Sequence, residues 1–390
     1  MSLPRVPLPS FLAQATAALR ALSAAQPSPL TLVVGNESAD LDSVCAAIVY
    51  AYLSSHRAPP RIHVPLVNLP RDDLAIRPEL TAVLLRAGLS PHCLPTLSDL
   101  PRHLAHGSAC DSLAWVLVDH NAPTGIVARA ATTLSGCIDH HHDENTVPLT
   151  AHPRLIEPCA SCTSLVVNLC AHDWDALSRR DSAGDASLAI LAMAPILADT
   201  SNLEAKDLIR DKDLRAAAML EAKLAPSHDF DRTQFYNSIK SAKADLSSLS
   251  LADILRKDYK QWGDLGISSI AQSLSWLISK AGGHMPLLDS LAAWAHHRHI
   301  KVLAIMTLHT KDGHLERQLV VWGFGPAARP IVAAFAHSAS APLRLKPWPA
   351  EAGLDSDLDD TENTRFAWSQ GNCRASRKIV APLLRAAFKL

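Results

Sequence analysis

Three short apolar segments early in the chain each end in a cluster of polar residues, and this repeated arrangement limits the fold more than any other feature. The apolar segments are residues 30–35, 113–118 and 136–138, and the clusters are residues 36–43, 119–121 and 139–142. Short apolar runs of this kind are typical of buried strands. Strands that alternate with helices indicate a parallel α/β sheet, in which ligands bind at the carboxyl ends of the strands. The clusters are therefore expected to converge at one edge of a sheet.

Helical periodicity lies between and after these predicted strands. It predicts helices over residues 42–55, 78–87, 161–171, 185–197 and 211–224, with a further strand over residues 61–69. Before the first strand, apolar residues recur at helical spacing from Phe11 to Leu22, which predicts an amphipathic helix. Residues 1–224 are thus predicted to form a mostly parallel-sheet domain with flanking helices.

The second half of the chain predicts a smaller, mixed α/β domain over residues 232–390, after a linker at residues 225–231. Strands are expected at residues 266–274, 302–307, 318–322 and 343–345, and helices at 285–294, 330–338 and 376–388. A turn at residues 311–313 would let the second and third of these strands pair antiparallel. Residues 350–364 hold four aspartates and are expected to form a solvated acidic loop.

Charge is divided unevenly along the chain. The sequence holds 37 Lys+Arg and 38 Asp+Glu, but from Ser227 onward it holds 20 against 15, which leaves 17 against 23 before that point. An acidic half can hold cations and a basic half can hold an anion. Chance variation between two domains explains these counts equally well, so the charges alone do not decide the partner.

Composition excludes several classes of protein. No run of about 18 apolar residues occurs, and Gln14 and Arg20 interrupt the N-terminal helix, so neither a transmembrane helix nor a signal peptide is expected. The eight cysteines are scattered, and the single C-x-x-C at Cys159 and Cys162 lacks a second pair at zinc-finger spacing. We expect a cytoplasmic protein, a monomer or weak oligomer, with no membrane or nucleic-acid partner.

The polar clusters hold residues that suit hard divalent cations. Asp40 and Asp42 follow the first strand, Asp119 follows a later one, and Asp139 precedes a run of histidines that starts at His140. Asp199 follows the predicted helix over residues 185–197. Carboxylates with one or two imidazoles favour Mg²⁺, Mn²⁺ or Co²⁺. Two such ions, about 3.5–4 Å apart and bridged by a carboxylate, can hold a nucleophilic hydroxide.

These segments resemble a known family. GNESADLDS (35–43), VDHN (118–121), IDHHH (138–142) and LADTSNL (197–203) resemble the four motifs of the DHH phosphoesterases. RKDYKQW (256–262) and SRKIVAP (376–382) resemble the markers of the DHHA2 domain. The resemblance spans nearly the whole chain, and IEPCASCTSL (156–165) looks most like the fungal-type exopolyphosphatases. Most members have a histidine ligand where this chain has Asn36, which shifts the expected metal toward Mg²⁺.

The resemblance implies a role for each residue of the site. Asp40 and Asp119 would hold a first metal, with Asn36 either a ligand or a hydrogen-bond donor to water. Asp42, Asp119, His140 and Asp199 would hold a second metal, so that Asp119 bridges the two ions. His141 would bond or protonate a phosphate oxygen. Asp139 would orient His140 or its loop, although a purely structural turn is as good an explanation, and His120 and His142 are possible substrate contacts.

The second domain is expected to supply the anion-binding residues. By the resemblance, Arg377 and Lys378 at the start of a helix and Lys260 in DYKQW would bind phosphate. The implied reaction is attack of a metal-bound hydroxide on the terminal phosphorus of inorganic polyphosphate, or of another short phosphoanhydride, with the domains closing at the linker. A pyrophosphatase, a prune-like nucleotide phosphodiesterase and a regulatory scaffold that retains the fold are the alternatives.

Overall fold

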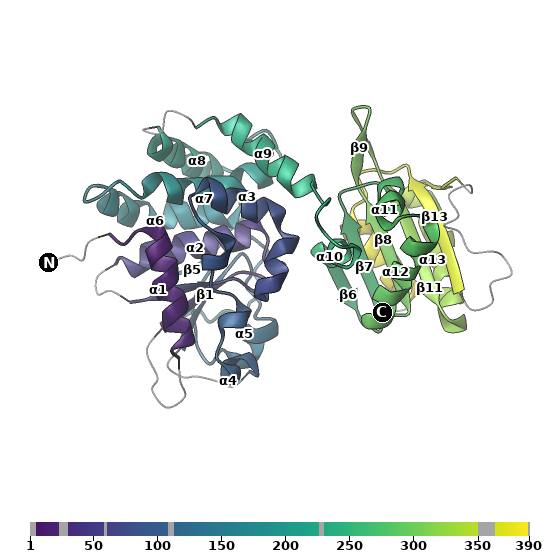
Figure 1. Cartoon of the computed structure of the whole chain (residues 1–390), viewed down its shortest axis with the longest axis horizontal. Coiled ribbons are helices and arrows are strands. Elements are labelled where there is room, and N and C mark those ends of the chain that lie inside the picture. The colour runs from purple at the N-terminus through teal and green to yellow at the C-terminus, as the bar shows by residue number, and fades with distance from the viewer. Residues whose placement is uncertain are drawn as a thin grey trace. The chain divides into compact units, whose positions relative to one another are not determined.

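Two compact units, Met1–Lys243 and Ala244–Leu390, make up the chain (Figure 1). The computed structural model describes residues 5–22, 30–57, 61–107, 113–225, 230–349 and 363–388. Each unit has its own sheet and its own apolar cores, as the alternation of predicted strands and helices requires.

The first unit contains a five-stranded sheet in which every pairing is parallel, in the order β2-β1-β3-β4-β5. Its strands are β1 Leu30–Val34, β2 His63–Leu66, β3 Leu113–Val118, β4 Leu134–Asp139 and β5 Arg154–Ile156. Because β1 pairs with both β2 and β3, the strand order reverses beside β1. The predicted parallel sheet is confirmed, and β5 is a strand that the sequence analysis missed.

Helices cover both faces of this sheet (Figure 1), which explains why its central strands β1 and β3 are apolar at nearly every position. Val33 of β1 packs in one core with α2, α6 and α7, whereas its neighbours Leu32 and Val34 pack in a second core with α1 and α5. The helices of the unit are α1 Leu8–Arg20, α2 Leu41–Ser55, α3 Pro78–Arg86, α4 Arg102–Ala105, α5 Gly125–Ala130, α6 Cys162–Ser178, α7 Asp185–Asp199, α8 Asp211–Leu224 and α9 Arg232–Ala244. The N-terminal amphipathic helix is confirmed as α1.

The predicted domain boundary precedes α9, whereas the division between the compact units falls at the C-terminal end of this helix. Phe235 and Ile239 of α9 are buried in the larger core of the first unit, which explains why the helix belongs to it. Residues 226–229 of the predicted linker lie outside the described residues, so the linker and its motion stay a prediction.

The second unit contains a mixed sheet of six strands in the order β12-β13-β11-β8-β7-β6. The β7–β8 pair is parallel and the other pairs are antiparallel. The strands are β6 Tyr259–Trp262, β7 Leu265–Ile270, β8 Val302–Thr307, β11 Gln318–Phe324, β12 Leu345–Pro347 and β13 Asn363–Gln370, and β9 His309–Lys311 and β10 His314–Glu316 form a separate hairpin. The predicted antiparallel pairing of β8 with β11 is confirmed.

Two helical layers cover this second sheet. Leu303 and Ile305 of β8 pack with α10, α11 and α12, and the alternating residues Val302, Ala304 and Met306 pack with α13 and α14. These helices are α10 Leu251–Lys257, α11 Leu274–Ala281, α12 His284–His297, α13 Arg329–Leu343 and α14 Arg377–Ala387.

Two strand predictions for this unit were wrong in detail. The strand expected to run to Leu274 ends at Ile270, because the Ser273 hydroxyl accepts the Trp276 N–H at 3.1 Å and starts α11. Leu343 ends α13 rather than starting a strand, since Arg344 takes a left-handed conformation with φ of 52°. Strand β13 was missed, and most of the predicted acidic loop before it, residues 350–362, lies outside the described residues.

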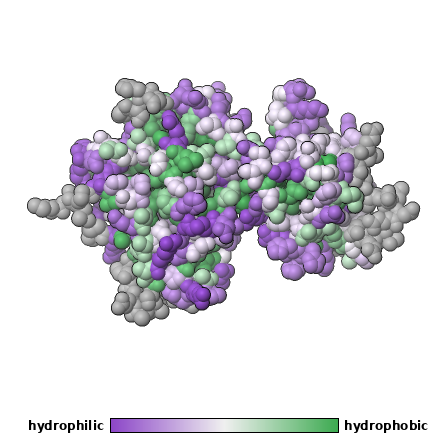
Figure 2. Space-filling view, viewed as in Figure 1, coloured by the Kyte–Doolittle hydropathy of each residue, from purple (hydrophilic) through white to green (hydrophobic). Residues whose placement is uncertain are grey.

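Hydrophilic and hydrophobic residues are interspersed on the visible face of each unit (Figure 2). Among the described helices, none combines the length and the apolar character needed to cross a bilayer.

Replacing Trp115 by alanine should destabilise the first unit by about 3–5 kcal/mol, because this side chain of β3 is fully buried in the core beneath α1 and α5. Urea denaturation followed by far-ultraviolet circular dichroism measures the change. Leu149→Ala is the matched control, since Leu149 is 88 % exposed and its loss should change stability by less than about 0.5 kcal/mol. Equal effects of the two substitutions would contradict the core assignment.

Candidate metal centre

The loops that follow β1, β3 and β4 lie at the carboxyl edge of the first sheet, beside the reversal in strand order. Asn36, Asp119 and His140 each lie one or two residues beyond the end of a strand. In open parallel sheets such a reversal leaves a crevice where ligands bind. The three predicted polar clusters therefore share one edge of one sheet.

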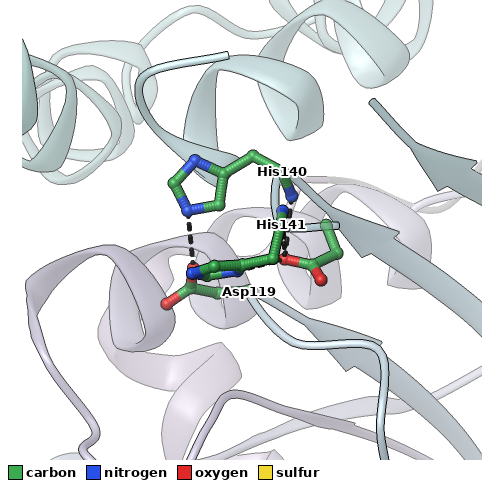
Figure 3. A group of neighbouring side chains, drawn as sticks. Asp119, His140 and His141 are labelled. Carbon is green, nitrogen blue, oxygen red and sulfur yellow. Dashed lines mark hydrogen bonds and ion pairs between the residues drawn. The ribbon is translucent and has the colours of Figure 1, made fainter. Parts of the chain in front are cut away.

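Asp119 lies at the centre of this edge. Its backbone φ is 61°, a left-handed conformation that aspartate tolerates better than most residues, and the residue is 3 % exposed. One carboxylate oxygen, Oδ2, accepts hydrogen bonds from Ser43 Oγ at 2.6 Å and Asn36 Nδ2 at 2.9 Å. The other, Oδ1, lies 3.2 Å from His140 Nε2 (Figure 3). The carboxylate of Asp119 thus joins the loops after β1, β3 and β4.

The first loop is held tightly against the start of α2. A Cβ at Gly35 would lie 2.6 Å from Cβ of Ser43, so only glycine permits this close approach. The amide oxygen of Asn36 accepts the N–H and the hydroxyl of Ser38, at 2.9 and 2.6 Å. This bonding turns the NH₂ of Asn36 toward Asp119, so Asn36 acts as a hydrogen-bond donor here. Asp40 is the N-cap of α2, where its Oδ1 accepts the Ser43 N–H at 3.1 Å.

Asp42 has a contact that the sequence analysis did not foresee. It is buried in the first turn of α2, and its Oδ1 accepts the hydroxyls of Ser161 and Thr163, both at 2.7 Å, and the Thr163 N–H at 2.9 Å. Its Oδ2 accepts the Cys162 N–H at 2.6 Å. Asp42 therefore caps α6, and the positive end of that helix stabilises the buried carboxylate.

The two histidines after β4 are fixed by different partners. His140 Nδ1 lies 3.0 Å from the carbonyl oxygen of Cys159, which can only accept, so Nδ1 carries the hydrogen and Nε2 faces Asp119. His141 Nδ1 lies 2.8 Å from Asp139 Oδ1, and its side chain is 57 % exposed. Asp139 thus contacts the ring of His141 and reaches His140 only through its backbone N–H at 2.8 Å.

Asn121 and Ser43 are site residues that were not singled out from the sequence, although both lie within the quoted motifs. Asn121 is buried, and its Nδ2 donates to Asp139 Oδ2 at 2.6 Å and to the carbonyl oxygen of His142 at 2.9 Å. It therefore ties the loop after β3 to the loop after β4. The side chain of His142 is exposed, and His120 is held by a 2.9 Å contact of Nδ1 with the Val118 carbonyl oxygen.

Electrostatics at this edge show a concentration of negative charge. Burial raises the pKa of Asp119 to about 7, with further increases from the charges of Asp42 and Asp40 that outweigh the hydrogen bonds from His140 and Ser43. Burial and the same two carboxylates hold the pKa of Asp199 well above its usual value, although Lys243 lowers it in part. Burial lowers the pKa of His140, but its hydrogen bonds to Asp119 and Cys159 raise it to about 12.

This donor set fits divalent cations. Ligand atoms of Asp119, Asp139, His140 and His141 all lie within 4.8 Å of one another. Carboxylate oxygens and imidazole nitrogens are ligands for Mg²⁺, Mn²⁺ and Co²⁺, and a cation would offset the buried negative charge. Asp40, Asp42 and Asp199 are not members of this group. The charges of Asp40 and Asp42 nevertheless raise the pKa of Asp119, and the charge of Asp119 raises that of Asp199. The joint ligation of metal by Asp40, Asp42, Asp119, His140 and Asp199 therefore stays a prediction.

Within the second unit, the predicted phosphate-binding residues lie at the start of α14 and on β6. Arg377 Nη2 lies 2.7 Å from Asp258 Oδ1, and Arg377 Nη1 donates to the Asp258 carbonyl oxygen at 3.0 Å. The side chains of Lys378 and Lys260 are exposed. Asp258 thus orients the guanidinium of Arg377 with two contacts and leaves its other N–H groups available to an anion.

Comparison with known proteins matches both units to families. Residues 31–197 match the model of the DHH family, N-terminal domain, and residues 237–387 match the DHHA2 domain. A Schizosaccharomyces pombe protein named "Putative exopolyphosphatase" is 31% identical over 385 residues, which cover 95% of this chain and 94% of that protein. Human exopolyphosphatase PRUNE1 is 27% identical, over 92% of this chain and 76% of its own length.

Among solved structures, a Methanococcus jannaschii protein described as a "putative family II inorganic pyrophosphatase" has a similar fold. The TM-score is 0.53 at 18% sequence identity, and the match covers 92% of this chain and 100% of that chain. This likeness confirms the two-unit α/β architecture.

Asp199→Asn should flatten the pH dependence of stability when divalent ions are removed with a chelator. An unfolded aspartate has a pKa of about 3.9, so above that pH the folded wild-type chain binds a proton that the unfolded chain has lost. Its stability should therefore fall as pH rises from about 4, and this fall should be smaller in the asparagine variant, which cannot titrate. Urea midpoints across this range test the sign, and parallel curves would contradict the raised pKa.

Proposed function

This chain belongs to the DHH/DHHA2 phosphoesterase family, and from that membership we propose that it is an exopolyphosphatase that removes the terminal phosphate of inorganic polyphosphate. The supporting observation is the pairing of Asp119 with His140 within a buried group of carboxylates. Relatives that align with nearly the whole of this chain carry the name exopolyphosphatase, which supports polyphosphate as the substrate class.

The carboxylate and imidazole side chains at the carboxyl edge of the first sheet are suited to binding divalent cations. We propose that Asp40, Asp42, Asp119, His140 and Asp199 hold two ions, with Asp119 shared between them. Divalent ions bound there would supply Lewis-acid charge and an activated water. The oxygen-rich set favours Mg²⁺, with Mn²⁺ and Co²⁺ as alternatives. Asn36 would support this arrangement by holding the Asp119 carboxylate through its NH₂ group.

His141 is the proposed proton donor or hydrogen-bond donor to a phosphate oxygen. Its Nδ1 is engaged by Asp139, so Nε2 remains for substrate. The hydrogen bond to Asp139 is the largest cause of its raised pKa, so the ring keeps a proton to higher pH than a free histidine. Asp139 would therefore serve by orienting His141, with Asn121 holding the second oxygen of Asp139 in place.

The second unit would bind the phosphate chain. Arg377 offers a forked pair of donors that Asp258 holds in one orientation, and Lys378 and Lys260 add exposed positive charge. Ser376 caps α14 by accepting the Lys378 N–H at 3.3 Å, and the first amides of this helix add a partial positive charge.

Asp119→Asn should lower phosphate release from long-chain polyphosphate by more than about a hundredfold and sharply weaken Mn²⁺ binding. The variant keeps the shape and the left-handed backbone of Asp119 but loses the negative charge that attracts the ions. The assay compares polyphosphate, pyrophosphate and a cyclic nucleotide with Mg²⁺, Mn²⁺ and Co²⁺. Wild-type hydrolysis of pyrophosphate or the cyclic nucleotide alone would contradict the proposed substrate, and an active Asp119→Asn variant would contradict the proposed site.

Arg377→Ala should raise the KM for polyphosphate by about tenfold or more, since a charge-assisted hydrogen bond contributes about 1.5–3 kcal/mol. Its Mn²⁺ affinity should not change. Arg385→Ala is the control, because Arg385 lies in the last turn of the same helix with its guanidinium 5.8 Å from the Trp262 ring centre. Steady-state kinetics decide the matter, and an unchanged KM for Arg377→Ala would show that the phosphate contact is elsewhere.

A further inference from the structure

Asp213 lies outside every motif that defines the proposed site, yet its carboxylate is fully buried at the N-terminal end of α6. It is the third residue of α8, and its Oδ2 accepts the Arg210 N–H at 2.8 Å, which satisfies a backbone donor at the start of that helix. The same oxygen accepts the Ala160 N–H at 3.1 Å, and Oδ1 accepts the Ser161 N–H at 3.4 Å. One carboxylate thus joins the N-terminal ends of two helices.

A single peptide group connects this carboxylate to His140. The N–H of Ala160 and the carbonyl of Cys159 belong to the same planar amide, which moves as one rigid unit. Its N–H donates to Asp213, and its carbonyl oxygen accepts the hydrogen of His140 Nδ1 at 3.0 Å. On the far side of the imidazole, Nε2 lies 3.2 Å from Asp119 Oδ1 (Figure 3). An unbroken series of contacts therefore runs from Asp213 to Asp119.

We propose that Asp213 is a positioning residue for His140, acting through the amide between Cys159 and Ala160. This inference rests on the proposed metal site. Histidine ligands of metal ions usually donate their second ring N–H to a carboxylate or a carbonyl, which fixes the ring and its tautomer. Here the carbonyl oxygen of Cys159 accepts the second ring N–H of His140, and the carboxylate of Asp213 holds the amide to which this carbonyl belongs. The negative charge of Asp213 also polarises the amide, which strengthens acceptance by its oxygen.

The arrangement goes beyond what a helix cap requires. A capping aspartate at the third position of α8 needs only its contact with the Arg210 N–H. Asp213 adds two contacts to a segment more than 50 positions away in the sequence, one to the amide that binds His140 and one to the next amide along the chain. The positive ends of α6 and α8 both favour its negative charge, which explains how a buried carboxylate is tolerated there.

Asp213→Asn is the test, with Asp211→Asn as the matched control. Asparagine keeps the volume but must direct its NH₂ at one of the three N–H groups, so at least one hydrogen bond is lost. Asp211 lies in the same turn of α8 and is exposed. Mn²⁺ affinity of the full-length chain is measured from the paramagnetic resonance signal of free Mn²⁺, and the ligand field from the visible spectrum of bound Co²⁺.

Asp213→Asn should bind Mn²⁺ about tenfold to a hundredfold more weakly and give a shifted Co²⁺ spectrum. In other metal sites, removal of a residue that positions a ligand through hydrogen bonds weakens metal binding by a similar factor. Asp211→Asn should match the wild type in both measurements. A folded Asp213→Asn variant with wild-type Mn²⁺ affinity and an unchanged Co²⁺ spectrum would overturn the proposal. If the wild-type chain binds Mn²⁺ but does not release phosphate from polyphosphate, only the proposed function fails.

Hydrogen exchange on the wild-type chain gives an independent test that does not require a folded variant. If Asp213 positions His140 through this amide, exchange of the Ala160 N–H should slow by about tenfold or more when Mg²⁺ is added, because holding the imidazole also holds its peptide partner. The amide of Ile305, in the core of the second unit, should not respond. Equal exchange of Ala160 with and without Mg²⁺ would overturn the proposal.

Discussion

The buried carboxylate of Asp119 is the contact on which the rest of this edge depends. It holds the amide of Asn36 in the loop after β1, the hydroxyl of Ser43 in the first turn of α2 and the imidazole of His140 in the loop after β4. Burial raises the pKa of Asp119, and the negative charges of the nearby carboxylates Asp42 and Asp40 raise it further. A divalent cation would offset this negative charge better than a single proton, since several carboxylates can share one cation. The same feature therefore explains the geometry of the loops and their suitability for metal.

Support for the proposed ligands comes mainly from the N-terminal end of α6. Asp42 and Asp213 bind consecutive backbone amides there, between Ala160 and Thr163, and the adjoining carbonyl of Cys159 holds His140. Residues on helices are positioned more rigidly than residues on free loops, and a ligand fixed by a second layer of hydrogen bonds keeps its geometry through a reaction cycle. Helix α6 thus supports the site although it supplies none of the predicted ligands.

The two units bring different chemistry to the proposed reaction. The first concentrates carboxylates and imidazoles at one edge of a parallel sheet, whereas the second presents Arg377, Lys378 and Lys260 at a helix start and on an edge strand. Cations alone would not hold a polyanion at several points, and basic residues alone would not activate water. Both matching families, the DHH family and the DHHA2 domain, occur together in this chain.

The sequence by itself determined the parallel sheet of the first unit and the grouping of polar clusters at its edge, because both follow from local periodicity. Strands β3 and β8 and helix α8 have the bounds that periodicity predicts. Only the tertiary structure decided that Asn36 donates to Asp119, that Asp139 binds the ring of His141, and that β13 lies inside the second sheet. Side-chain rotamers and strand neighbours depend on packing and on hydrogen-bond partners from distant segments, and Asp42 meets its partners about 120 residues away. Periodicity carries no record of such partners.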